Sequence, residues 1–143
     1  MVEIKIVTKT GKVPEYETSG SAGMDLRANL ESPVVLKPGE RRLIETGLFV
    51  EIPEGYEAQV RARSGLSIKH GITLINGIGT VDSDFRGELK VPLVNLGQED
   101  FVIEDGDRIA QMVIAKYSKV TWKIADNLSE TERGEGGFGH TGV

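Results

Sequence analysis

The sequence predicts an all-β fold of short antiparallel strands, arranged as a sandwich, a jelly roll or a closed barrel. Two observations support this prediction. Apolar and polar residues alternate with a period of two over most of the chain, which is the pattern of half-buried strands. Turn-forming sequences recur between these segments, and the 18 glycines in 143 residues exceed the usual share of roughly 7%.

The alternating segments follow one another along the chain at 3–7 (EIKIV), 41–52 (RRLIETGLFVEI), 56–62 (YEAQVRA), 87–96 (GELKVPLVNL) and 107–117 (DRIAQMVIAKY). Turns are expected between them at 37–40 (KPGE), 53–56 (PEGY), 95–100 (NLGQED) and 104–107 (EDGD). We expect strands in the first set because each segment fits the two-residue repeat better than a helical one.

Three further segments are less regular. Residues 64–71 (SGLSIKHG) predict one short helix, with Ser64 as its N-terminal cap and Gly71 at its end. Residues 76–90 (NGIGTVDSDFRGELK) predict a hairpin whose turn carries the acidic, aromatic and basic residues of 82–87. Residues 21–28 (SAGMDLRA) are too irregular for the interior of a strand.

The length predicts a single domain with its own core, which we place at residues 1–125. Residues 126–143 are mainly polar and glycine, and they predict a flexible C-terminal tail outside that core.

Composition excludes several classes of protein. A net charge of -5 argues against a non-specific nucleic-acid binder, which needs a basic face. The absence of cysteine excludes a disulfide framework and a thiolate zinc site. No apolar run approaches the roughly 18 residues of a membrane span, and no signal-peptide pattern is present at the N-terminus. We therefore expect no membrane partner and a cytoplasmic location.

Residues 134–139 (GEGGFG) match the dinucleotide pattern G-x-G-x-x-G, but we reject that match. The pattern requires a following helix and an acidic residue about 20 positions further on, and only four residues follow Gly139. A P-loop sequence is absent, and neither His70 nor His140 lies in a triad or zinc-protease pattern.

Five segments carry polar or charged residues in irregular surroundings: AGMDL (22–26), RSGLS (63–67), NGIGTVDSDFRGE (76–88), GDRIAQM (106–112) and RGEGGFGHTG (133–142). In the second, an arginine, a hydroxyl and the N–H groups of a helix start together suit an anion. Taken singly, each has an ordinary structural explanation, such as a turn aspartate or a solvated arginine. Together, in this order and spacing, they resemble the five motifs of the trimeric dUTPases (deoxyuridine triphosphate nucleotidohydrolases). The resemblance covers nearly the whole chain and implies a jelly-roll-like β-barrel of the dUTPase-like, β-clip type.

The resemblance implies hydrolysis of dUTP to dUMP and pyrophosphate by attack of water on the α-phosphorus. Such an enzyme supplies dUMP for thymidylate synthesis and keeps uracil out of DNA. Asp82 would activate the water, because a carboxylate is ionised at neutral pH and can accept the proton. Ser64 would lie near the leaving oxygen and Gln111 would bind a phosphate oxygen. Mg²⁺ would be held by the triphosphate, with Asp25 acting on the metal-bound water and not as a direct ligand.

The resemblance also implies which residues bind the nucleotide: Arg63, Ser64, Gly65, Asn76, Thr80, Val81, Asp82, Phe85, Lys90, Gln111, Arg133, Phe138 and Gly139. The main chain of the predicted hairpin would bind the uracil edge, and the aromatic ring after D-x-D would pack under the deoxyribose. That position is usually tyrosine in the family and is Phe85 here, so we expect sugar discrimination without the hydroxyl. His140 stands where serine is usual, and we expect a main-chain role there.

The family forms homotrimers with active sites between subunits, and the glycine-rich tail would close over a neighbour's site. In that closed state Arg133 would bind the terminal phosphates and Phe138 would stack on the uracil. One alternative of the same fold is a dCTP deaminase or a bifunctional deaminase–dUTPase, which needs a glutamate where Asp82 stands. The other is a non-catalytic jelly-roll module, which would have no reason to keep Arg63, Asp82, Gln111 and Arg133 together.

Overall fold

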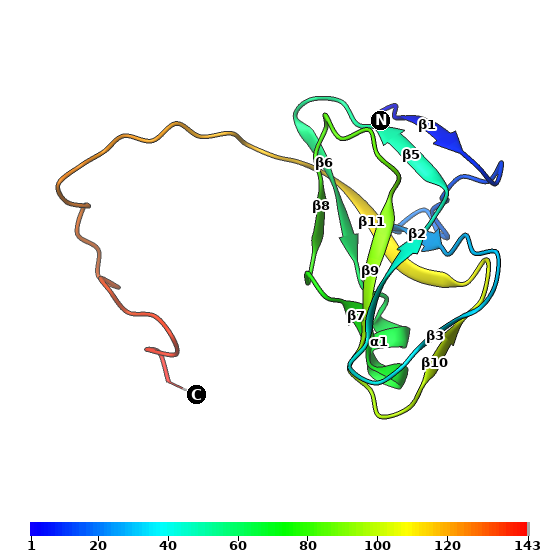
Figure 1. The fold of residues 1–143 in the computed structure, drawn as a ribbon. Coiled ribbons are helices and arrows are strands. Elements are labelled where there is room, and N and C mark those ends of the chain that lie inside the picture. The colour runs from blue at the N-terminus through cyan, green and yellow to red at the C-terminus, as the bar shows by residue number, and fades with distance from the viewer. Residues whose placement is uncertain (143) are drawn as a thin grey trace.

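A computed structural model describes residues 1–142 of the chain (Figure 1). Within them the elements are β1 (Lys5–Thr8), β2 (Gly23–Arg27), β3 (Val34–Leu36), β4 (Arg41–Glu45), β5 (Leu48–Glu51), β6 (Tyr56–Arg61), α1 (Ser64–His70), β7 (Ile72–Leu74), β8 (Gly79–Val81), β9 (Lys90–Asn95), β10 (Phe101–Ile103) and β11 (Arg108–Lys116). The predicted all-β class with one short helix is confirmed. In this part of the chain no helix has the length and apolar character needed to cross a membrane.

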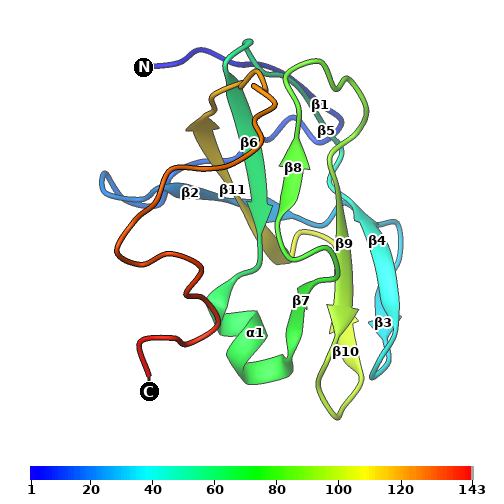
Figure 2. The ribbon, with the colours of Figure 1, turned by 90° about the vertical axis from the view of Figure 1, so that its left-hand side faces the viewer.

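The strands of the described residues form four antiparallel sheets. The largest has the order β2-β11-β6-β8, the second has the order β4-β9-β7, and the pairs β1–β5 and β3–β10 complete the set. Figure 2 shows β6, β8 and β11 together, with α1 packed beyond the end of β6. Buried aliphatic side chains from every sheet, among them Leu26, Ile44, Leu93 and Ile103, form one core that fixes the sheets against each other.

The segment 21–28 was predicted not to be a strand interior, and this was wrong. Residues Gly23–Arg27 form β2, which pairs with β11 from Gly23↔Val113 to Arg27↔Arg108. Its burial does not alternate cleanly, and a shift of register interrupts the pairing near Arg108. Hydrogen bonds from a distant strand, and not a local pattern, therefore make this segment extended.

The predicted hairpin at 76–90 was also wrong. β8 pairs with β6, whereas β9 pairs with β4 and β7, so residues 82–89 cross between two sheets. The single strand predicted at 41–52 is divided into β4 and β5 by Thr46 and Gly47, and Gly47 has the left-handed φ of 71° that favours glycine.

The short helix is confirmed at Ser64–His70, and Gly71 ends it with a left-handed φ of 69°. Its N-terminal cap is Arg63 and not Ser64, which is the first helical residue, and no side chain bonds to the cap. The last predicted strand is confirmed as β11.

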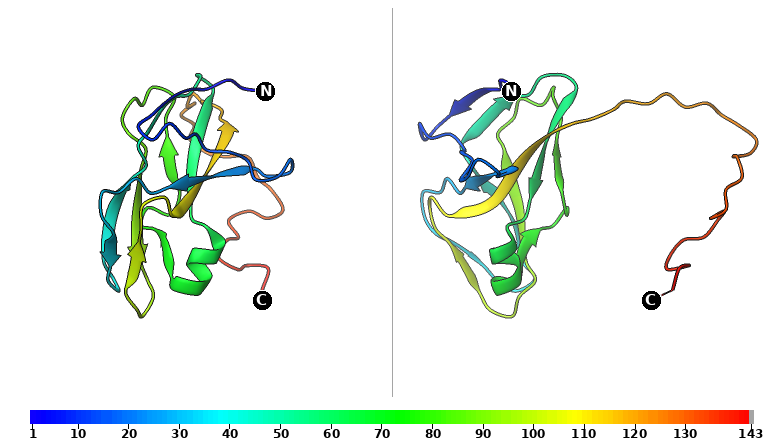
Figure 3. Two further views of the ribbon diagram at one scale, coloured as in Figure 1. Left: turned by 90° about the vertical axis from the view of Figure 1, so that its right-hand side faces the viewer. Right: turned by 180° about the vertical axis from the view of Figure 1, so that it is seen from behind.

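Beyond β11 the chain leaves the body of the protein (Figures 1 and 3). The main-chain N–H of Tyr117 still donates to the oxygen of Gly55 at 3.1 Å, and all residues from 118 to 135 are exposed. The division into a domain at 1–125 and a tail at 126–143 stays a prediction.

Candidate active site

The four-stranded sheet brings three of the five polar segments together. Gln111 of β11 lies in register with Asp25 of β2 on one side and with Arg61 of β6 on the other. The chain continues from β6 directly to Arg63, which opens α1. The first, second and fourth segments therefore meet near the carboxyl end of β6.

Asp25 is held between two arginines. Its Oδ1 atom lies 3.1 Å from Arg63 Nε and its Oδ2 atom lies 3.6 Å from Arg108 Nη1. Arg63 Nη1 also donates to the main-chain oxygen of Arg108 at 3.3 Å. The Asp25 side chain is only 19% exposed, so the two guanidinium groups neutralise a mostly buried carboxylate and are fixed in direction by it.

Arg108 was not among the predicted site residues, although it stands in the segment GDRIAQM. It also lies 3.5 Å from Glu17 Oε1. Beside the cluster is a cavity of about 380 Å³ that three arginines line, namely Arg27, Arg63 and Arg108. A planar guanidinium group can donate two parallel hydrogen bonds to two oxygens of one phosphate. This side of the sheet is therefore suited to binding an anion.

The start of α1 adds main-chain donors next to Arg63. The N–H groups in the first turn of a helix have no acceptor within the helix, and α1 carries no acidic residue there. Ser64 and Gly65 are both exposed. The predicted pair thus lies beside Arg63 and is open to a ligand.

Gln111 is oriented by its neighbours on the sheet. Its Nε2 atom donates to the main-chain oxygen of Ala62 at 3.0 Å. Its amide lies against Gly23, where a Cβ atom would collide with Oε1. Gly23 therefore provides the space that the amide occupies.

Asp82 follows β8 and is exposed on the loop that leads to β9. It lines a cavity of about 690 Å³ together with Glu57 and Asp84. The loop is braced by Arg86, whose Nη1 atom donates to the oxygens of Ser83 at 2.7 Å and of Phe85 at 3.0 Å.

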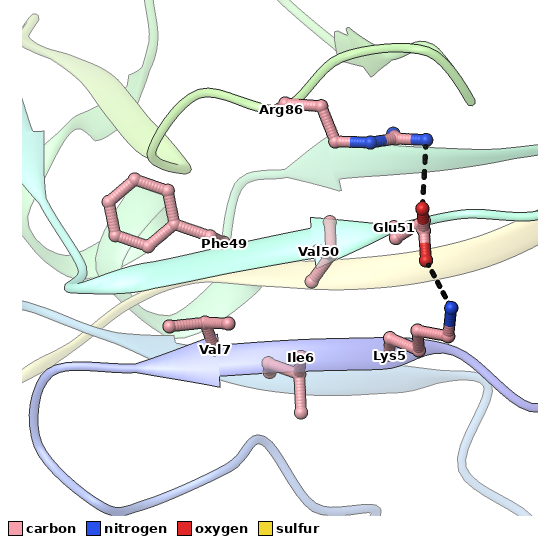
Figure 4. Close-up of a pocket in the computed structure, with 7 residues that line it drawn as sticks. All are labelled: Lys5, Ile6, Val7, Phe49, Val50, Glu51 and Arg86. Atoms are coloured by element: carbon pink, nitrogen blue, oxygen red, sulfur yellow. Dashed lines mark hydrogen bonds and ion pairs between the residues drawn. The ribbon is translucent and has the colours of Figure 1, made fainter.

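Arg86 connects this loop to β5 and, through Glu51, to β1. Glu51 Oε1 lies 3.4 Å from Arg86 Nη2, and Oε2 lies 3.0 Å from Lys5 Nζ (Figure 4). The hydrogen bond and charge of Lys5, followed by the charge of Arg86, lower the pKa of Glu51 below its ordinary 4.5.

Within one chain, Asp82 does not lie near Asp25, Arg63 and Gln111. Because β8 and β6 are antiparallel and Val81 pairs with Ala58, Asp82 lies near the beginning of β6, whereas Arg63 lies beyond its end. The corresponding span of β6 runs from position 57 to position 63, which is roughly 20 Å of extended chain at ~3.3 Å per residue. A single chain therefore holds the two groups at opposite ends of a strand.

Three of the remaining predicted contacts, Asn76, Thr80 and Val81, lie in or just before β8, which is one of the two edge strands of its sheet. Asn76 and Thr80 are exposed, whereas the Val81 side chain is only 9% exposed and belongs to the core. Only the main chain of Val81 can therefore face a ligand. Lys90 lies at the start of β9, 3.7 Å from Glu45 Oε1.

The tail residues stand apart from both groups. Arg133 Nε donates to the oxygen of Gly136 at 2.8 Å, and Phe138 is fully exposed with a left-handed φ of 48°. Figure 3 shows this end of the chain clear of the sheets, so in this structure Arg133, Phe138 and Gly139 complete no site. Nor do residues 1–142 contain a group of three or more His, Asp or Glu side chains able to hold a metal ion.

These features define an all-β protein with a phosphate-suited arginine cluster, a separate exposed aspartate and a glycine-rich tail. A family model described as dUTPase matches residues 9–142, nearly the whole chain. The chain belongs to the dUTPase family, as the five segments predicted.

Relatives agree with this assignment. The chain is 56% identical over 142 residues to the deoxyuridine 5'-triphosphate nucleotidohydrolase of Finegoldia magna, covering 99% of both chains. It is 63% identical over 131 residues to that of Treponema denticola, covering 92% of this chain and 91% of the relative. These matches do not favour the deaminase alternative.

Solved structures agree as well. The dUTPase of Staphylococcus bacteriophage 80alpha with dUPNHPP is 28% identical, covers 100% of both chains and superposes with a TM-score of 0.90. A tyrosine-to-phenylalanine mutant of the same phage enzyme, with dUpNHpp, is 29% identical, covers 100% of both chains and has a TM-score of 0.86.

Proposed function

We propose that the protein hydrolyses dUTP to dUMP and pyrophosphate, and so supplies dUMP for thymidylate synthesis and keeps uracil out of DNA. The observation that carries the proposal is the meeting of Asp25 and Gln111 of one sheet with Arg63 at the start of α1, in a chain whose family match covers residues 9–142. The reaction needs alignment and charge neutralisation of a triphosphate, and this cluster has the groups for both.

Arg63, the N–H groups at Ser64 and Gly65, and the amide of Gln111 bind the phosphates. Arg108 also binds phosphate, because its guanidinium group contacts the Asp25 carboxylate beside that of Arg63. These donors are fixed before substrate arrives, which avoids reorganisation during the reaction.

Mg²⁺ would be carried on the triphosphate, because this cation keeps several of its waters and takes phosphate oxygens readily. Asp25 would be the residue of this chain that holds the metal's water shell. When bound, the metal would supply neutralisation of charge on the phosphate oxygens.

The nucleoside is bound at β8. An edge strand has unpaired main-chain N–H and C=O groups, which can bind the uracil edge with Asn76, Thr80 and Lys90 around it. A cytosine would present the opposite donors and acceptors, and leaving buried polar groups unpaired is costly. The Phe85 ring packs under the deoxyribose and leaves no room for a 2′-hydroxyl.

Asp82 accepts a proton from the attacking water. The water oxygen bonds to the α-phosphorus as the bond from that phosphorus to the bridging oxygen breaks, and pyrophosphate leaves near Ser64. Since Asp82 and Arg63 are roughly 20 Å apart along one chain, the water-activating group comes from a second copy. This separation supports a site shared between subunits, as in the proposed homotrimer.

The exposed segment after β11 also supports assembly. Val120, Trp122 and Ile124 are 68%, 90% and 98% exposed and, in an extended chain, lie on one face. A largely apolar groove of about 450 Å³ lies along β1 and β5, where Ile6, Val7, Phe49 and Val50 line it (Figure 4). Within the described residues β1 pairs only with β5, so this groove of a second copy can receive the apolar face of the segment.

The tail completes the site in the substrate complex. Its glycines let the main chain approach the phosphates, Arg133 binds the terminal phosphates, Gly139 contributes to the same contact and Phe138 stacks on the uracil. The free-energy cost of ordering the tail is offset only when a bound triphosphate accepts hydrogen bonds from its main-chain N–H groups. We place this activity in the cytoplasm.

The function is tested by incubating the purified protein with Mg²⁺ and dUTP, dCTP, UTP or dTTP in turn. Pyrophosphate from dUTP alone is expected, whereas ammonia from dCTP or no turnover at all would contradict the proposal. Asp82→Asn should lower kcat by about 10²–10⁴-fold while nucleotide still binds, because the base is lost and the phosphate contacts are not. Asp84→Asn, two residues away on the same exposed loop, is the matched control and should stay close to wild type.

The shared site is tested by mixing two inactive variants. In trimers assembled from equal amounts of Asp82→Asn and Arg63→Ala chains, about a quarter of the sites receive both wild-type groups and regain activity. If both groups came from one chain, mixed trimers would show no recovery.

A further inference from the structure

The Phe85 ring lies directly on Gly87. A Cβ atom built on Gly87 would fall 2.6 Å from Phe85 Cζ and 2.9 Å from Cε1, both far inside van der Waals contact. The ring can therefore occupy its position only because residue 87 has no side chain. This contact is made by the tip of the ring, at Cζ and the two Cε atoms.

The main chain beneath the ring is fixed separately. The N–H of Phe85 donates to the oxygen of Asp82 at 3.2 Å, and Arg86 Nη1 donates to the oxygen of Phe85 at 3.0 Å. Arg86 is itself held to Glu51 of β5. The position of the Phe85 backbone is thus set by hydrogen bonds, and the contact with Gly87 is made by its ring.

We propose that Gly87 determines the specificity for the sugar. Because Gly87 has no side chain, the Phe85 ring can occupy the position in which it distinguishes deoxyribose from ribose. The inference rests on the proposed function, in which Phe85 packs under the deoxyribose.

Gly87→Ala separates this role from folding. The φ angle of Gly87 lies outside the left-handed region, so alanine suits its backbone. Phe85 is 43% exposed, so its ring can swing away from the new methyl group without disturbing the core. The variant should fold and carry a displaced ring.

The test compares kcat/KM for dUTP and for UTP in four proteins: wild type, Gly87→Ala, Phe85→Ala and the double variant. Gly87→Ala should lower the dUTP/UTP ratio roughly tenfold, the size of effect expected from a change of one methyl group in a close-packed pocket. The double variant should show the ratio of Phe85→Ala alone, because Gly87 acts through the ring. Gly20→Ala is the matched control, since a Cβ there meets nothing within 4 Å and its φ is not left-handed.

An unchanged ratio in Gly87→Ala, or an equal loss for both substrates, would overturn the proposal. So would full discrimination in Phe85→Ala, which would show that the ring does not select the sugar. The contact itself is checked without turnover by NMR: nuclear Overhauser effects are expected between the Hα protons of Gly87 and the ring protons of Phe85. Those effects together with no hydrolysis of dUTP would reject the proposed function, and their absence in the wild type would reject the contact.

Discussion

Gly23→Ala tests whether the position of the Gln111 amide controls the reaction. A Cβ atom at residue 23 would lie 3.3 Å from Gln111 Cδ and 3.5 Å from Gln111 Cβ, and it would overlap Oε1. Carbon atoms normally approach to about 3.5–4.0 Å, so the amide must move. Its hydrogen bond to the main-chain oxygen of Ala62, which is 3.0 Å long in the wild type, should break as the amide turns away.

The size of the effect follows from this displacement. A misplacement of about 1 Å in a group that positions substrate costs around 10²-fold in rate. That factor corresponds to about 2.7 kcal/mol of activation free energy. We expect kcat for dUTP to fall by about this amount and never further than in Gln111→Ala, which removes the amide altogether.

Steady-state kcat and KM for dUTP are measured for both single variants and for the double variant. Gly23 has no left-handed φ, so the backbone accepts alanine, and unchanged thermal unfolding should accompany the fall in rate. Gly20→Ala, in open space three residues earlier, should match the wild type. A wild-type kcat in Gly23→Ala, or a further large decrease on adding it to Gln111→Ala, would refute the reasoning.

Three other changes test separate parts of the structure. Asn95→Leu leaves unpaired the oxygens of Leu36 and Glu99 and the N–H of Gly97, each now 2.8 Å from the buried amide. It should cost about 3 kcal/mol and lower the Tm by roughly 6–12 °C, and an unchanged Tm would contradict this. Glu51→Gln should lower the Tm at neutral pH but leave it unchanged well below pH 4.5. The reason is that a carboxylate with a lowered pKa stabilises the fold only while it is ionised. An equal decrease of the Tm at both pH values would speak against the ion pairs. Deletion of residues 133–143 should leave the proposed trimer intact in size-exclusion chromatography and nearly abolish turnover, and a fully active truncation would rule out closure of the tail over the site.

The sequence predicted those strands whose faces alternate and missed those that depend on a distant partner. β6 and β11 have six and nine residues, long enough for a local pattern to be visible, and the buried positions of β6 alternate. β3, β7 and β10 have three residues each, too few for a period of two to be recognised. β2 is extended because it pairs with β11, and β8 turns away from β9 because its partner is β6.

The site residues divide in the same way, into those that a local pattern reveals and those that depend on a distant strand. The five segments identified the residue types and the family, because spacing along the chain is a property of the sequence. The two arginines on Asp25 and the distance between Asp82 and Arg63 depend on strand register, which no local pattern reveals. Arg108 was overlooked for that reason.

The length of β6 has a consequence for activity in dilute solution. On the proposed mechanism a lone chain, even when correctly folded, has the water-activating Asp82 near one end of β6 and the phosphate-binding Arg63 beyond the other end. Turnover per chain should therefore fall on dilution below the concentration at which trimers dissociate, while the circular dichroism of the β-sheets persists. A chain lacking Asp82 would inactivate the site that contains its neighbour's Arg63. The site that contains its own Arg63 would stay active, because a neighbour provides Asp82 there. A minority of such chains would therefore inactivate sites on wild-type partners.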